Sequence, residues 1–223
     1  MGWRGVPCPW RADPRHLTGL LHGAYAFTGV AGFWRDRLAG KDTAEEPCEE
    51  AAEEAGYHFA LRRLQSRLVV RTLLTSGRLT AEGRALVSGL ARTLDGWLRE
   101  PVPAAALARA RTAAALHRTE WRLRNVAPDA GPVPEFPRFR SDRVPWPDTR
   151  TRTFATRPTA PRTADEYLAA GRPAAALARY DEALADDPAE PHALAGWIVA
   201  RAALEPGRAS RRLLARPERL RLP

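Results

Sequence analysis

Apolar side chains recur at helical spacing through most of the first 125 residues. Between Leu17 and Leu38 they fall three or four positions apart, which is typical of a helix with one buried face. Comparable stripes run through residues 45–76, 81–100 and 104–125, and no stretch alternates as a half-buried strand does. The short connections between these stretches favour antiparallel neighbours. The pattern therefore predicts an all-α fold in which residues 1–125 form an antiparallel helical bundle.

Capping signals predict the helix ends. Asp13 followed by Pro14 predicts the start of the first helix, because aspartate accepts hydrogen bonds from orphan amides and proline presets φ. Gly77 and Thr80 predict the end of the second helix and the N-cap of the third, and Pro103 predicts the start of the fourth. We expect the third helix to bury one stripe, made of Leu86, Leu90, Leu94, Trp97 and Leu98.

The first helix is rich in glycine. Its glycines are Gly19, Gly23, Gly29 and Gly32. Each costs about 1 kcal/mol relative to alanine, so we expect a neighbouring helix to approach this small face closely. The run from Leu17 to Trp34 has no charged residue and reaches the lower limit of a membrane span. Because it contains His22 and four glycines, and charged residues follow it, we interpret it as a buried helix with no membrane role.

Composition changes after residue 125. Residues 126–162 hold eight prolines, which indicates a linker or an extended arm. We expect its aromatic residues to lie against a surface: Phe136, Phe139, Trp146 and Phe154.

Residues 163–223 return to helical spacing and end in a basic tail. Part of this segment resembles a tetratricopeptide repeat, through Tyr167, Gly171, Ala176, Tyr180, Ala183 and Pro188. One and a half repeats are too few to stand alone, so we expect these helices to dock on another surface.

The net charge is +9, from 35 basic and 26 acidic residues, and all but one of the basic residues are arginine. Because the arginines are spread along the chain without a known binding module, we expect no nucleic-acid partner. Binding that weakens steeply with salt would reveal the opposite. Six glutamates within residues 45–54 suit the N-terminal end of a helix, with a metal or cationic-partner site as the alternative.

The two cysteines, Cys8 and Cys48, form neither a CxxC motif nor a disulfide framework. The first residues lack the apolar region of a signal peptide. We therefore expect reduced thiols and a cytoplasmic location.

Candidate chemistry is sparse. A zinc hydrolase of the HExxH type needs two histidines on one helix face, and the sequence contains no such motif. His16 and His22 are six residues apart, about 240° around a helix, and His58, His117 and His192 stand singly. No GxSxG motif or phosphate-binding loop occurs. We predict no catalytic, cofactor-binding or metal residue, and we expect His58 and His117 to be packed and His192 to be exposed.

Residues 9–34, PWRADPRHLTGLLHGAYAFTGVAGFW, resemble the segment that follows the metal motif in the HEXXH motif-containing peptide modification proteins. These metallohydrolase-like domains occur beside, or fused to, radical SAM peptide maturases. The resemblance is carried by Trp10, Arg11, Asp13, Pro14, Arg15, Gly19 to Gly23, Tyr25, Ala26, Phe27, Val30, Ala31, Phe33 and Trp34. Later residues resemble the family's C-terminal helices, namely Leu73, Gly77, Leu79, Thr80, Gly83, Trp97, Pro101, Pro103, His117, Trp121 and Asn125.

The resemblance implies that residues 1–125 are the C-terminal part of such a domain without its HExxH helix, in a truncated, split or degenerate member. It implies zinc only for a longer relative, in which His22 would be a third ligand or a groove residue. We expect a chain that is not catalytic alone and binds a peptide or a maturase in ribosomal peptide maturation. Its groove would be lined by His22, Tyr25, Phe33 and Trp34. The alternative is a tetratricopeptide-like adaptor unrelated to peptide maturation.

Overall fold

The structure is a computed structural model that describes residues 6–40, 48–126 and 153–220. Within these residues every named secondary-structure element is a helix, and the predicted all-α class is confirmed. The chain divides into two compact units. Unit 1 comprises Met1–Arg11 and Arg15–Arg111, and unit 2 comprises Ala12–Pro14 and Thr112–Pro223. The division falls inside the fourth helix, before the predicted linker, most of which lies outside the described residues.

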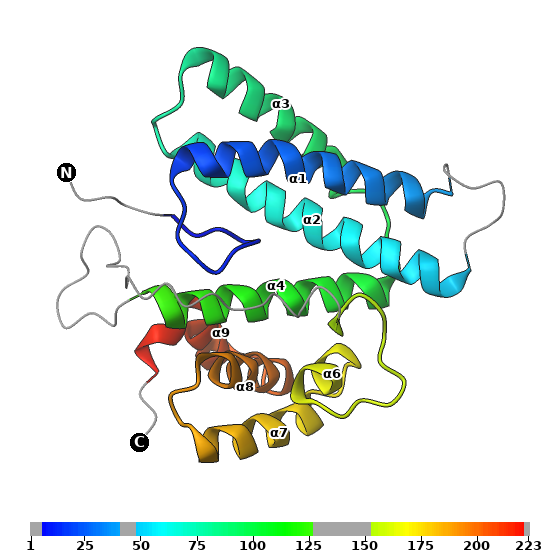
Figure 1. Cartoon of the computed structure of the whole chain (residues 1–223), viewed down its shortest axis with the longest axis vertical. Coiled ribbons are helices and arrows are strands. Elements are labelled where there is room, and N and C mark those ends of the chain that lie inside the picture. The colour runs from blue at the N-terminus through cyan, green and yellow to red at the C-terminus, as the bar shows by residue number, and fades with distance from the viewer. Residues whose placement is uncertain (1–5, 41–47, 127–152, 221–223) are drawn as a thin grey trace. The chain divides into compact units, whose positions relative to one another are not determined.

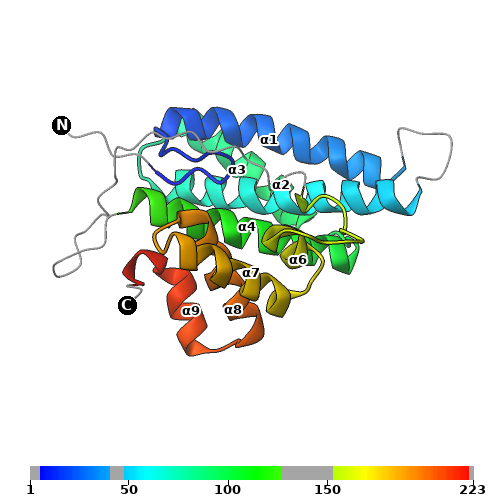
Figure 2. The same cartoon turned by 60° about the horizontal axis from the view of Figure 1, so that its bottom comes forward.

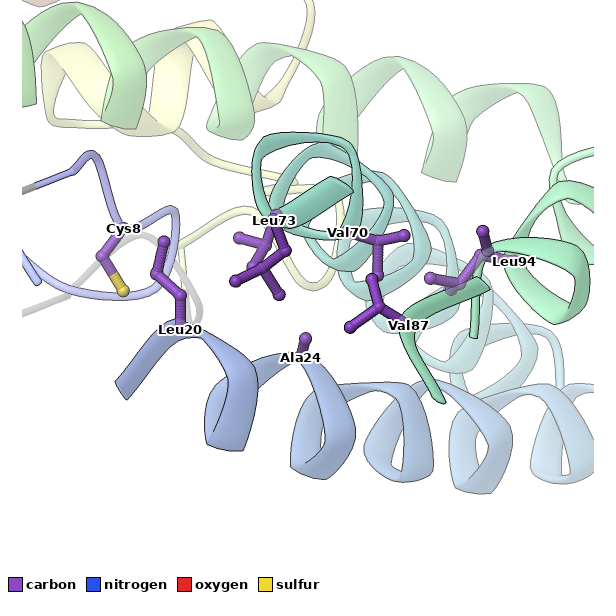
Figure 3. Close-up of a cluster of buried hydrophobic side chains, with 9 residues drawn as sticks. Cys8, Leu20, Ala24, Val70, Leu73, Val87 and Leu94 are labelled. Atoms are coloured by element: carbon purple, nitrogen blue, oxygen red, sulfur yellow. The ribbon is translucent and has the colours of Figure 1, made fainter. Parts of the chain in front are cut away.

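Unit 1 contains α1 (Leu17–Leu38), α2 (Glu49–Thr75), α3 (Ala81–Trp97) and the first turns of α4 (Ala104–Asn125). Figures 1 and 2 show α1 and α2 side by side over most of their length, with α3 packed against them. The three helices and the N-terminal loop enclose one apolar core (Figure 3), made of Cys8, Leu20, Ala24, Val69, Val70, Leu73, Val87, Ala91 and Leu94.

The predicted start of α1 is wrong. The helix begins at Leu17, and its N-cap is His16, whose Nδ1 accepts a hydrogen bond from the Thr18 N–H at 3.4 Å. Asp13 cannot cap it because Arg15 is extended and pairs with Val6 in an antiparallel bridge, with N–O distances of 2.8 and 2.9 Å. A backbone bridge to the N-terminal loop has therefore overridden the local capping signal.

The ends of the later helices follow the sequence signals. The Thr80 hydroxyl oxygen accepts a hydrogen bond from the Gly83 N–H at 3.1 Å and caps α3. Gly77 has a φ of +67°, the left-handed conformation expected just after a helix. The Pro103 carbonyl accepts a hydrogen bond from the Leu107 N–H at 3.0 Å and opens α4.

The predicted stripe of α3 is correct for Leu94 and in part for Leu90 and Trp97, which pack against the core, and is wrong for Leu86 and Leu98. The helix buries Val87, Ala91 and Leu94, whereas Leu86 and Leu98 are exposed. Both sets of residues fall at helical spacing, so the sequence offers two neighbouring apolar stripes. The stripe with the smaller side chains at positions 87 and 91 is the one that enters the core.

Two glycines of α1, Gly23 and Gly32, pack against indole rings. This corrects the expectation that the backbone of a neighbouring helix approaches the glycine face closely. A Cβ at Gly23 would lie 2.4 Å from the Trp10 ring, and one at Gly32 would lie 3.3 Å from the Trp97 ring. A Cβ at Gly29 would meet no atom within 4 Å. Packing therefore explains Gly23 and Gly32 but gives no reason for glycine at position 29.

Unit 2 contains the last turns of α4, followed by α6 (Ala164–Ala169), α7 (Pro173–Asp186), α8 (Pro191–Leu204), α9 (Arg208–Ala215) and the 3-10 turn η1 (Pro217–Arg219). Thr163 and Glu166 form a capping box at the start of α6. Tyr180 of α7 packs over Gly196 of α8, where an added Cβ would lie 2.1 Å from the ring. Glycine at position 196 therefore lets the tyrosine ring lie directly on the backbone of α8.

Phe154 is fully buried, as expected of an aromatic residue packed on a surface. The other aromatic residues of that segment, Phe136, Phe139 and Trp146, lie outside the described residues. None of the described helices is long and apolar enough to cross a membrane.

Candidate functional site

Helix α1 carries the four predicted binding residues and presents most of them to solvent. It turns one face to the core, through Leu20, Ala24, Thr28 and Ala31. On the opposite face Tyr25 is 66% exposed, Phe33 is 51% exposed and Val30 is 37% exposed. His22 is also exposed. We call His22, Tyr25, Val30 and Phe33 the outer face of α1.

Helix geometry places these residues on one side of α1, across an arc of about 140°. Eleven residues turn a helix through three turns and about 20°, so His22 and Phe33 share a face and lie about 16 Å apart along the axis. Tyr25 and Phe33 stand on either side of Ala26 and Gly29, both exposed and small. The outer face therefore has an aromatic ring towards each end, with the small residues Ala26 and Gly29 between the two rings.

Trp34 lies at the edge of this face and packs onto α2. Its ring stacks on the His58 ring, with centroids 4.3 Å apart and planes at 22°. Phe33 meets the Trp34 ring edge-on at 5.3 Å, and Tyr57 meets the His58 ring edge-on at 5.1 Å. The structure thus brings Phe33 and Trp34 together with His58, a partner that the sequence did not indicate.

His22 does not join that cluster. It lies twelve residues before Trp34, which is about 120° around the helix and about 18 Å along it. The four predicted residues therefore do not converge on a single point, and Tyr25 and Trp34, nine residues apart, lie on opposite sides of the helix.

His58 is buried and neutral. The residue is only 7% exposed, its Nδ1 has no hydrogen-bond partner in the described part of the chain, and its Nε2 lies 3.8 Å from Glu54 Oε1. Burial, aided by the positive charge of Arg62, lowers the pKa of His58 to about 4. The ring therefore offers Trp34 an uncharged stacking surface at neutral pH.

Among residues 6–40, 48–126 and 153–220, no three His, Cys, Asp or Glu side chains gather in a way that could hold a metal ion. Cys8 is buried in the core of unit 1 and Cys48 is exposed, and neither forms a disulfide. The site must therefore be judged as a binding surface, from the outer face of α1.

The prediction that His192 is exposed is wrong, because the residue is half-buried between two carboxylates. Its Nδ1 lies 3.0 Å from Glu120 Oε2, and its Nε2 lies 3.0 Å from Asp165 Oδ2. Tyr180 donates a 2.5 Å hydrogen bond to Asp165 Oδ1, and Arg124 donates a 2.9 Å bond to Glu120 Oε1. Both ring nitrogens face carboxylates, so the imidazole is protonated and donates from each of them.

This cluster in unit 2 joins α4, α6, α7 and α8 through one cation. Burial opposes the charge, but hydrogen bonds to the Asp165 and Glu120 carboxylates and their negative charges raise the pKa of His192 to about 10. No local sequence pattern predicts this cluster, because His192 lies 72 and 27 residues from its two partners.

Two arginines, Arg35 and Arg63, stabilise the fold of unit 1. The buried Arg63 of α2 donates hydrogen bonds to the carbonyl oxygens of Trp97 and Glu100 at the C-terminal end of α3, the latter at 2.9 Å. Arg35 of α1 donates a 2.6 Å bond to the Glu100 carboxylate. Cations at a helix C-terminus complement its dipole, so these arginines hold α3 in place.

Comparison of this chain with models of known families, with curated proteins and with solved structures finds no match. The resemblance to the HEXXH motif-containing proteins therefore rests on the sequence motifs alone.

Proposed function

We propose that this chain is a non-catalytic binding protein of ribosomal peptide maturation, which holds a peptide or a maturase on the outer face of α1. The observation that carries the proposal is the exposure of Tyr25 and Phe33 on one face of a helix whose other face is fixed in the core. Single exposed apolar residues are common, but a group of them on one side of a rigid element is typical of a protein-binding surface.

The chemistry of the outer face suits a polypeptide. Tyrosine and phenylalanine supply large contact areas with few rotatable bonds, and such residues dominate the energetics of interfaces. The small centre at Ala26 and Gly29 would let a partner helix or strand approach the α1 backbone. The resemblance of residues 9–34 to the HEXXH motif-containing proteins supports the choice of partner, since their maturases act on peptides.

The absence of an HExxH motif from the sequence supports a role without metal chemistry. Titration of the purified protein with zinc in a calorimeter is expected to show no tight stoichiometric site. Stoichiometric binding would overturn the non-catalytic part of the proposal.

The binding test immobilises as probes any precursor peptide and radical SAM maturase that the neighbouring genes encode. The double variant Tyr25→Ala/Phe33→Ala is expected to lose about tenfold or more in affinity, because each truncated aromatic anchor removes about 1 kcal/mol or more. The matched control is Leu86→Ala/Leu98→Ala, which removes two exposed apolar side chains from α3. An equal loss in both variants, or unchanged binding in the first, would overturn the proposed surface.

A tetratricopeptide-like adaptor remains the second candidate, and the contact of Tyr180 with Gly196 favours it. Tyr180 belongs to the second helix of the matched repeat and Gly196 to the helix that follows it, so the contact is one between successive units, as stacked repeats require. If the neighbouring genes encode no precursor peptide or radical SAM enzyme, this candidate is preferred.

A further inference from the structure

The last helix of unit 2 is amphipathic and bears a dense set of arginines. Arg208, Arg211 and Arg212 fall at positions i, i+3 and i+4 of α9, which places them on one side of the helix. Arg216 and Arg219 follow within the next turn and η1. All five side chains are exposed, and none forms an ion pair within the described residues. We call these five residues the arginine face.

The opposite side of α9 is anchored. Ser210 is buried and donates a 2.5 Å hydrogen bond to the Glu205 carbonyl, and Arg118 donates a 3.3 Å bond to the Leu214 carbonyl. Arg122 holds the Glu218 carboxylate of η1 with contacts of 2.9 and 2.5 Å. The arginine face is therefore presented by a helix whose position in unit 2 is fixed on several sides.

Several other arginines of unit 2 have acidic partners. Arg122 pairs with Glu218, and Arg179 pairs with Glu182 at 2.9 Å. Five like charges without partners repel one another, which a helix surface tolerates better when anions neutralise them. Because the guanidinium fork matches a carboxylate with two parallel hydrogen bonds, the row is suited to several carboxylates in succession.

We propose that the arginine face of α9 binds an acidic segment of a partner protein. It would be a second binding surface, on a different unit from the outer face of α1 and independent of the function proposed for that face.

The surroundings favour an acidic polypeptide over a nucleic acid. Surfaces that bind single strands combine basic residues with aromatic stacking platforms, and the sequence from Arg208 to Arg219 contains no aromatic residue. Unit 2 also exposes a group of carboxylates on and just after α7, namely Asp181, Glu182, Asp186 and Asp187. Carboxylates on the same unit disfavour a long polyanion such as a nucleic acid, whereas a short acidic segment can contact the arginines alone.

The test measures binding of the full chain to a short fluorescein-labelled oligoglutamate by fluorescence anisotropy at low salt. A labelled DNA duplex of similar total charge is titrated in parallel. The triple variant Arg208→Glu/Arg211→Glu/Arg212→Glu is expected to weaken oligoglutamate binding by about tenfold, because each exposed pair changes affinity several-fold. The matched control is Arg84→Glu/Arg92→Glu/Arg99→Glu, which makes the same charge change at exposed positions of α3 and just beyond its end.

The proposal is supported if the wild-type chain prefers oligoglutamate and only the α9 variant loses it. An equal loss in the control would show that net charge acts without a defined surface, and would overturn the proposal. Tighter binding of the duplex would overturn it in favour of a nucleic-acid partner. Absence of binding to both probes would also overturn it. Circular dichroism of both variants checks that the helices remain folded.

Discussion

At the scale of single residues, His192 is the most constrained side chain of unit 2. It holds two carboxylates, Glu120 and Asp165, which are themselves largely buried. Removing the His192 side chain would leave the Glu120 and Asp165 carboxylates without the positive charge between them. Loss of one partner from a buried ion pair is strongly destabilising. The consequence is that one histidine supports the contacts among α4, α6 and α8.

We predict that His192→Ala lowers the free energy of unfolding of the chain by about 2–3 kcal/mol, measured by urea denaturation. His22→Ala is the control, because His22 is exposed and should change stability by less than about 0.5 kcal/mol. A His192 variant as stable as the control would show that the cluster contributes little.

The residue scale also marks the limit of prediction from sequence. Tyr25 and Phe33 could be placed on one face of a helix because the helical period relates neighbours in the chain. The Trp34–His58 stack and the His192 cluster bring together residues on different helices, and no local pattern encodes those pairs. The shared helix of the candidate site was therefore predictable, whereas the exposure of its residues, on a helix expected to be buried, and their buried partners were not.

At the scale of elements, the helices of unit 1 follow their apolar periodicity, but their register depends on packing. The start of α1 is set by the bridge between Val6 and Arg15, and the buried stripe of α3 is set by the fit of Val87 and Ala91. Both outcomes are contacts between elements distant in the chain. Periodicity therefore predicts that a helix exists better than it predicts which of two adjacent stripes is buried.

Two glycines of α1 provide a test of element packing. We predict that Gly29→Ala raises the free energy of unfolding by up to about 1 kcal/mol, because alanine favours the helix and a Cβ there meets no neighbour. Gly23→Ala should lower it by about 1–3 kcal/mol, because its Cβ would collide with the Trp10 ring.

Urea denaturation of both variants measures the difference. The first variant also bears on function, since a partner that approaches Gly29 closely would bind it less well despite its greater stability. Equal effects of the two substitutions on stability would contradict the packing described for Trp10.

At the scale of the whole molecule, the two units carry histidines with opposite responses to pH. His58 in unit 1 has a pKa of about 4 in the folded protein, below the value near 6.5 in the unfolded chain. The unfolded chain therefore binds a proton at His58 more readily than the folded protein does. Unit 1 should lose stability as the pH falls from about 6.5 towards 4. His192 in unit 2 has a pKa of about 10, so its contribution is complete below about 6.5 and is lost as the pH rises towards 10.

We therefore predict that acid weakens unit 1 first and alkali weakens unit 2 first. Methyl NMR of the full chain across this range would follow Leu20 in unit 1 and Ile198 in unit 2, both buried. The variant His58→Phe keeps an aromatic ring against Trp34 and should abolish the acid-side loss. Parallel weakening of both methyl signals at either extreme would contradict the prediction.

The stack of Trp34 on His58 has an optical consequence. A protonated imidazole quenches the fluorescence of an indole ring in contact with it, whereas a neutral one does so weakly. Because His58 stays neutral down to a pH near 4, Trp34 remains emissive under ordinary conditions. Because the chain has seven tryptophans, the difference in emission between the wild type and a Trp34→Phe variant would report the arrival of a ligand that touches the neighbouring Phe33.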